Sequence, residues 1–186
     1  MVKQIGGEKM QSKILARCAL FAALMCLCAW ISFPLGQNPI TLQTFALFLT
    51  LELLGGKYGS LVCLVYLLLG GIGLPVFSGF RGGFGMLLGA TGGYLWGFLL
   101  CSLLYWLITH LFGKNLPIRL AAHLGGLLLC YALGTTWFYG VYLQVGSELG
   151  IGFVILKCVV PFVLPDLLKL FLALGLAKKL KRFANA

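Results

Sequence analysis

The chain has 186 residues, of which 61% are hydrophobic and 10% are charged, and its formal net charge is +10. Long apolar runs broken by glycine are typical of an all-α integral membrane protein. At about 20 residues for each span, this length predicts six membrane-spanning helices in a single transmembrane domain over residues 1–186, without a soluble catalytic domain. The basic residues cluster at the ends of the expected helices, which indicates membrane orientation rather than nucleic-acid binding.

The first expected helix follows a basic amino-terminal segment and occupies the apolar run Cys18–Phe33. No clear small-x-small cleavage site precedes Pro34, so we interpret this run as a helix rather than a signal peptide, with the amino terminus in the cytoplasm. Ala19 and Ala23 place small residues on one helix face, where another backbone can approach closely. That backbone could belong to this bundle or to a partner, and the spacing does not separate the two.

The second and third expected helices, residues 40–54 and 59–72, are separated by a glycine-rich turn over residues 55–59. Glu52 lies near this turn and is close in sequence to Lys57. This proximity favours an ion pair between the two side chains at the membrane surface.

Residues 73–85 are rich in glycine but also contain large apolar side chains and a single charge, Arg81. This composition predicts a loop that lies back over the bundle. Within it, Gly79–Gly85 is expected to form a lid, with its phenylalanines as an apolar underside. From Gly85 to Cys101 a small residue recurs at every fourth position, which in a helix would form a groove for close packing. Alternatively, the fourth helix begins only at Gly92-Gly93; in either case it is expected to end near Phe112.

The carboxyl-terminal third is expected to contain two further spanning helices. The fifth helix is expected over residues 120–143, whereas residues 151–160 are too short to span and are interpreted as an interfacial or re-entrant piece. The last helix is expected over Pro165–Ala177, because a proline suits the first helical position, where its missing N–H is not needed.

The motif Asp166-x-x-Lys169 lies inside this last apolar run and contains the only aspartate of the chain. Residues at i and i+3 share one face of a helix, so the carboxylate and the ammonium group should lie side by side. Ionisable side chains at membrane depth are costly unless they face a partner or a cavity, which predicts a polar site inside the bundle. The alternative is an internal ion pair that only fixes helix packing.

No metal site, bound cofactor or enzymatic activity is expected. The seven cysteines lie in apolar runs without a Cys-x-x-Cys motif, and are interpreted as small buried residues. His110 and His123 flank a short basic connection and are interpreted as residues of the membrane interface rather than metal ligands. The chain has no glycine-rich phosphate loop ending in Lys-Ser/Thr, so any ATP must be hydrolysed by another protein.

The distribution of basic residues predicts the topology. Most of them lie in the two terminal segments and in the turns at residues 55–59 and 113–119. By the positive-inside rule, both termini and these two turns face the cytoplasm. Arg81, Glu148, Asp166 and Lys169 then lie toward the outside, which predicts one polar site at the outer leaflet.

Short motifs occur in a specific combination over most of the chain. They are Thr41-Leu42-Gln43-Thr44-Phe45, Tyr66-Leu67-Leu68-Leu69-Gly70, Gly73-Leu74-Pro75-Val76-Phe77, Arg81-Gly82-Gly83, Gly89–Tyr94, Pro161-Phe162 and Asp166-x-x-Lys169. This combination resembles the BioY family, the biotin-binding S components of energy-coupling factor (ECF) transporters. The resemblance implies a six-helix S-component bundle with a lid loop and a biotin pocket on its outer side.

The resemblance also implies roles for individual residues. Asp166 would accept a hydrogen bond from a ureido N–H of biotin, and Lys169 would donate to the ureido oxygen. Arg81 would bind the carboxylate of the valerate tail, because a guanidinium group suits bidentate pairing with a carboxylate. Further substrate-binding residues implied in the same way are Gln43, Thr44, Phe77 and Tyr94.

Partners and alternatives follow from the same comparison. A transmembrane T component would dock on Ala19 and Ala23, and two cytoplasmic ATPases would hydrolyse ATP at the cell membrane. One alternative is an S component for thiamine or riboflavin, and another is a biotin transporter that works without the ATPases. An intramembrane enzyme using Asp166 is disfavoured, because no second carboxylate or nucleophile is placed to meet it.

Overall fold

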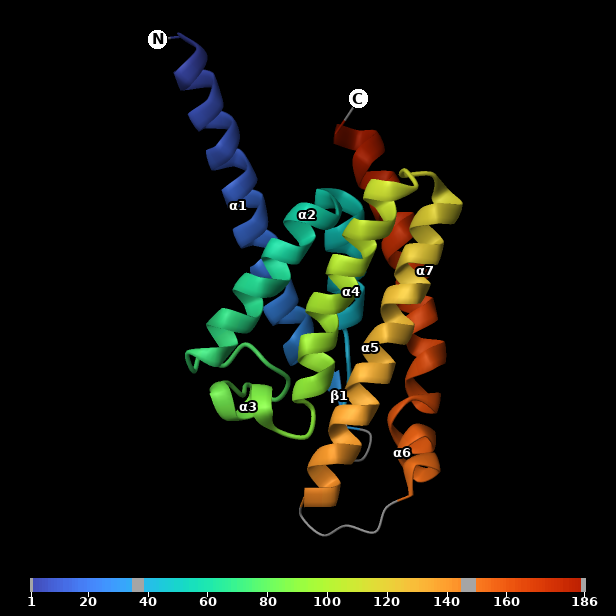
Figure 1. Cartoon of the computed structure of the whole chain (residues 1–186). Helices are drawn as coiled ribbons and strands as arrows, with labels where there is room; N and C mark the ends of the chain where they lie inside the picture. Colours follow the sequence, from blue (N-terminus) through green and yellow to red (C-terminus); the bar gives the residue numbers. More distant parts are fainter. Residues whose placement is uncertain (1, 35–38, 145–149, 185–186) are drawn as a thin grey trace.

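The computed structural model describes residues 2–34, 39–144 and 150–184 and is almost entirely helical over these ranges (Figure 1). Glu148, which was expected to lie toward the outside, falls outside the described residues. One antiparallel pair of two-residue strands places Ser32 opposite Thr41. Five helical stretches of the described residues are long and apolar enough to cross a membrane. The elements are α1 (Val2–Trp30), β1 (Ser32–Phe33), β2 (Ile40–Thr41), α2 (Gln43–Gly71), α3 (Phe84–Leu88), α4 (Gly92–Leu111), α5 (Leu116–Gln144), α6 (Ile151–Cys158) and α7 (Val160–Ala184).

Helix α2 reverses its direction in the middle and therefore consists of two helices. Gly55 has φ 78° and ψ 171°, a left-handed conformation that glycine adopts without strain. The two halves lie side by side, because the Gln43 amide bonds the Tyr66 hydroxyl at 2.6 Å and Gly59 packs on Leu51. Figure 1 shows α2 turning back near the end of the bundle that carries the termini. Together with the other long stretches, this hairpin confirms the expected six helices.

Helices α4 and α5 pack closely through small residues. Helix α4 begins at Gly92, so the second of the two starts expected for it is confirmed. A Cβ atom added to Gly97 would lie 2.6 Å from the sulfur of Cys130, and one added to Gly126 would lie 2.5 Å from that of Cys101. The small residues of the sequence pattern therefore bring the two backbones together, but only over the part of the pattern that lies in α4.

Helix α7 begins earlier than expected. It starts at Val160, directly after the short helix α6 and the non-helical Val159, so Pro165 lies inside the helix rather than at its first position. The first turn instead contains Pro161, whose missing N–H is not needed there. Pro165 leaves the carbonyl of Pro161 without its usual helical donor. The helix also continues beyond Ala177 through the basic carboxyl-terminal residues.

Among the described residues, two large clusters of buried apolar side chains fill the bundle, and a third, smaller cluster contains Phe138, Val154 and Cys158. The larger cluster joins α1, α2 and α4 and includes Met25, Leu51 and Tyr66. The second joins α2, α5 and α7 through Phe48, Leu127 and a group of residues on α7. Both ends of the chain lie at the same end of the bundle, and the β strands and α3 lie toward the opposite end (Figure 1).

Candidate ligand-binding site

A cavity opens in the half of the bundle that lies away from the termini. Its empty volume, which includes the open space at its mouth, is about 810 Å³. The lining is mostly apolar with a few polar side chains, the composition typical of such sites. The seven residues expected to bind a substrate all line this cavity: Gln43, Thr44, Phe77, Arg81, Tyr94, Asp166 and Lys169.

Asp166 connects three helices within the cavity wall. Its Oδ1 accepts hydrogen bonds from the Lys169 ammonium group at 2.8 Å and from the Thr44 hydroxyl of α2 at 2.7 Å. Its Oδ2 accepts one from the Tyr131 hydroxyl of α5 at 2.6 Å. Asp166 is 3% exposed and Lys169 is 7% exposed. The ion pair is therefore buried and internally bonded, yet it also faces the cavity.

Gln43 connects the cavity to the loop after α2. Its amide nitrogen donates to the Tyr66 hydroxyl, which donates in turn to the carbonyl of Val76 at 3.0 Å. The next residue, Phe77, is buried, and its ring packs against Gly70, where a larger residue would collide with it. The loop is thus anchored to α2 at the point where Phe77 enters the cavity wall.

Arg81 reaches the cavity from this loop. The Phe77 amide donates to the Arg81 carbonyl at 2.9 Å, and the Arg81 Nε donates to the Ser78 carbonyl at 3.2 Å. Phe80 stacks on Trp30 with ring centroids 4.9 Å apart. Trp30 is a stacking partner outside the cavity, so the Phe80 side chain points away from the cavity. The exposed Phe84 does not line the cavity either. The expected apolar underside of the lid is therefore wrong for its two phenylalanines, whereas Phe77, which precedes the lid, lines the cavity.

Tyr94 lies where α4, α5 and the α6–α7 region meet. Its hydroxyl is 3.2 Å from the Thr135 hydroxyl and donates to the Cys158 carbonyl at 3.4 Å. Tyr131 was not predicted from the sequence, although a tyrosine deep in an apolar run normally needs a partner for its hydroxyl. Other lining residues that it missed include Met86, Thr91, Leu95, Phe98, Cys130 and Phe162.

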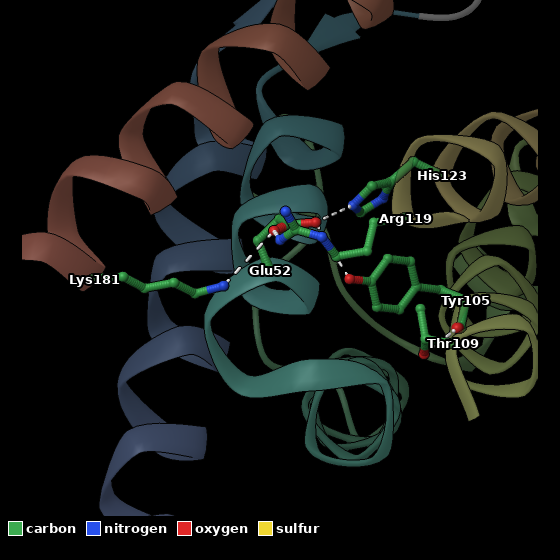
Figure 2. Close-up of polar contacts among 6 residues, drawn as sticks. All are labelled: Glu52, Tyr105, Thr109, Arg119, His123 and Lys181. Atoms are coloured by element: carbon green, nitrogen blue, oxygen red, sulfur yellow. Dashed lines mark hydrogen bonds and ion pairs between the residues drawn. The ribbon is translucent and has the colours of Figure 1, made fainter. Parts of the chain in front are cut away.

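A second polar cluster lies toward the end of the bundle that carries the termini, and it centres on Glu52 (Figure 2). Glu52 is 5% exposed. Its carboxylate bonds the Arg119 guanidinium group, lies 3.0 Å from Nε2 of His123 and accepts a hydrogen bond from the Tyr105 hydroxyl at 3.2 Å. The ammonium group of Lys181 lies 3.8 Å away. We refer to these five residues as the Glu52 cluster.

The Glu52 cluster corrects two expectations. Glu52 does not pair with Lys57 at the surface, because the chain reverses at Gly55 between them and Glu52 faces α5 and α7. The ammonium group of Lys57 instead lies over the ring of Tyr58. His123 is fully buried, so it is not a residue of the membrane interface.

Ala19 and Ala23 are exposed on the outer side of α1, whereas their neighbour Ala22 is buried. The two alanines therefore do not pack inside this bundle. In the described part of the chain, the face that they share is open to lipid or to a partner.

Known proteins share both the fold and the sequence pattern. The S-component for biotin from an ECF-type ABC transporter has a similar structure, with a TM-score of 0.80 and 24% identity over 94% of this chain and 93% of that chain. The S component of a bacterial ECF transporter matches with a TM-score of 0.62 and 15% identity over 95% of this chain and 99% of that chain. The fold is therefore that of the S components.

The sequence defines the family more closely. The model of the BioY family matches residues 3–186. The biotin transporter BioY of Thermotoga maritima is 41% identical over 90% of this chain and 95% of its own length. The probable biotin transporter BioY of Pyrococcus horikoshii is 36% identical over 92% of this chain and 98% of its own length. The chain belongs to the BioY family, a family of transporters rather than enzymes, which confirms the resemblance found in its motifs.

Proposed function

We propose that this chain is the biotin-binding S component of an ECF-type importer and that it captures biotin in the cavity around Asp166. The observation that carries this proposal is the buried Asp166–Lys169 pair facing the cavity, in a chain of the BioY family. A fixed donor and acceptor side by side suit the ureido head of biotin, which has two N–H donors and one strong acceptor oxygen.

The polar groups of the cavity retain capacity for a ligand. A carboxylate has about four acceptor sites, of which Lys169, Thr44 and Tyr131 occupy three in Asp166. In the described part of the chain, Asp166 is the hydrogen-bond partner of the Lys169 ammonium group, so further N–H groups can donate to the ureido oxygen. The apolar ring of biotin would pack on aromatic lining residues such as Phe77 and Tyr94.

Arg81 would bind the carboxylate of biotin. Its Nε is bonded to the carbonyl of Ser78, but the terminal nitrogens of a guanidinium group carry four further N–H donors. A pair of these can contact both carboxylate oxygens at once. In this arrangement the ligand extends from Asp166 to the loop, and the loop closes over it as a lid.

The basic residues support an outward-facing cavity. Both termini lie at one end of the bundle (Figure 1), near the basic carboxyl-terminal residues of α7. The positive-inside rule places this end in the cytoplasm and the cavity toward the outside. A transmembrane T component would then dock on the exposed Ala19 and Ala23, and two cytoplasmic ATPases would supply the energy.

Titration of the purified protein with biotin, thiamine and riboflavin tests this proposal. We expect saturable one-to-one binding of biotin and no saturable binding of the other two vitamins, because neither carries a carboxylate that Arg81 could bind while the other end of the ligand meets Asp166 and Lys169. Saturable binding of thiamine or riboflavin in place of biotin would contradict the proposal and favour an S component for another vitamin.

A further inference from the structure

The Glu52 cluster joins the same three helices as Asp166, at the opposite end of their contact. Asp166 of α7 is bonded by Thr44 of α2 and Tyr131 of α5. Glu52 of α2 is bonded by Arg119 and His123 of α5 and is approached by Lys181 of α7 (Figure 2). Asp166 therefore bonds α7 to both α2 and α5, and Glu52 bonds α2 to α5 with a charged group of α7 nearby.

The spacing of the two carboxylate contacts is matched on α2 and α5. Thr44 and Glu52 are eight residues apart, and so are Tyr131 and His123. Eight residues of helix correspond to about 12 Å, or just over two turns. Between the two polar contacts the helices pack through apolar side chains such as Phe48, whose ring meets that of His123 edge-on at 5.2 Å.

Apolar packing alone fixes the positions of these helices poorly. Lipid tails are as apolar as leucine side chains, so burial of apolar surface does not drive helices together within a membrane. Hydrogen bonds to a buried carboxylate, in contrast, hold their partners in a defined geometry. Polar contacts at two levels therefore fix both the distance and the relative sliding of α2 and α5.

We infer that Glu52 is a positioning residue for the biotin site. It does not line the cavity, but it holds α2 and α5 so that the Thr44 and Tyr131 hydroxyls meet Asp166 at 2.7 and 2.6 Å. Misplacement of binding groups by about 1 Å is enough to impair a site. This inference rests on the proposed function, because the affinity for biotin is its readout.

The substitution Glu52→Gln tests the inference while keeping the size of the side chain. It removes the charge that holds Arg119 and Lys181, so we expect biotin affinity to fall at least fivefold, a typical size for coupling between two sites. The number of binding sites per folded protein should not change. Thr50→Val is the matched control: it removes a buried hydroxyl of α2 that bonds the Ala46 carbonyl of the same helix, outside both the Glu52 cluster and the cavity lining, and should leave the affinity unchanged.

A double variant separates positioning from general destabilisation. If Glu52 acts through the Tyr131–Asp166 contact, adding Glu52→Gln to Tyr131→Phe should weaken binding by less than the product of the two separate effects. Additive effects, or an unchanged affinity with fewer binding-competent molecules, would contradict the inference and leave Glu52 with a role in stability only.

A pair of substitutions at His123 decides the question if Glu52→Gln does not fold. His123→Gln keeps an amide donor near the position of Nε2 and should retain biotin affinity, whereas His123→Leu removes the donor and should lower it. Equal affinities would overturn the inference.

A wild-type protein that bound no biotin would instead contradict the proposed function. Hydrogen exchange of the backbone around Thr44 and Tyr131 would then test the positioning, because faster exchange in the Glu52 variant supports it and equal exchange contradicts it.

Discussion

At Asp166 a single carboxylate meets an ammonium group and two hydroxyl groups, contributed by three helices. Taking a carboxylate and an ammonium group out of water is costly, and their attraction offsets this cost only when further hydrogen bonds satisfy the remaining polar sites. Thr44 and Tyr131 supply those bonds. They fix the direction in which the carboxylate points before any ligand arrives.

Tyr131→Phe should weaken biotin binding without unfolding the protein. A hydrogen bond to a charged group contributes about 1.5–3 kcal/mol, so the affinity should fall about tenfold or more as Asp166 loses its bond at Oδ2. Isothermal titration calorimetry measures this change. Tyr139→Phe, on the same helix but outside the cavity lining, is the control, and equal affinities in the two variants would contradict the role of Tyr131.

The sequence predicted some residues of the site better than others. The Asp166–Lys169 pair is visible because its members are three positions apart on one helix. Tyr131 and Thr44 are separated from Asp166 by 35 and 122 positions, and their contacts depend on how whole helices pack. The contact of Thr44 with Asp166 was not predicted, and Tyr131 was not found.

Among the helices, α4 and α5 illustrate how glycines control packing. Gly125 and Gly126 are neighbours on α5, but a Cβ added to Gly125 would be 3.8 Å from Leu104, whereas one added to Gly126 would be 2.5 Å from Cys101. The first distance is an ordinary contact, whereas the second requires the Cys101 side chain or the two helices to shift.

The two glycines should therefore respond differently to alanine. We expect Gly126→Ala to destabilise the bundle by about 1–3 kcal/mol through overpacking, and so to lower its thermal unfolding temperature. Gly125→Ala should leave this temperature unchanged or raise it slightly, because alanine favours the helix. Thermal unfolding followed by intrinsic fluorescence measures both, and an equal effect of the two substitutions would show that α4 and α5 do not approach closely at Gly126.

The loop that carries Arg81 should discriminate between acid and ester forms of the ligand. Biotin methyl ester lacks the anionic carboxylate and should bind the wild type more weakly than biotin, whereas Arg81→Ala should bind the two about equally. A spin label at Ser78 should also lose mobility when biotin closes the loop. If the Arg81 variant still prefers the acid as strongly as the wild type, another donor holds the carboxylate, and Lys157 is the first to test.

The order of the helices was more predictable than their ends. Apolar length and glycine turns predicted six helices and the reversal near residue 55, because each span must satisfy its own backbone. The predicted start of α7 was wrong, because two prolines, Pro161 and Pro165, each suit a helix start, and tertiary packing decides between them. The predicted partner of Glu52 was wrong, because Lys57 is its neighbour in the sequence but lies beyond the reversal of the chain.

Considered as a whole, the molecule keeps the face with Ala19 and Ala23 apart from the cavity. Both alanines are exposed on α1, and neither lines the cavity. Binding of the ligand and contact with a partner should therefore be separable by mutation.

Ala19→Trp and Ala23→Trp should block biotin uptake by the complete transporter while the isolated protein still binds biotin. A large side chain prevents the close backbone approach that small residues permit. Uptake by cells and binding by the purified variants are the two measurements. The buried Ala22 offers a contrast, because Ala22→Trp should disrupt the bundle itself. Normal uptake in both exposed variants would contradict docking at this face.

The central claim is that the charged pair in the cavity binds biotin, and the double variant Asp166→Asn/Lys169→Met tests it most directly. Removing both charges leaves neither of them buried and unpaired, so the bundle should remain folded. Titration calorimetry should then show that biotin affinity has fallen by at least tenfold, as expected when charged hydrogen bonds to a ligand are lost. A folded double variant that binds biotin as tightly as the wild type would contradict the claim and show that the pair only holds the helices together.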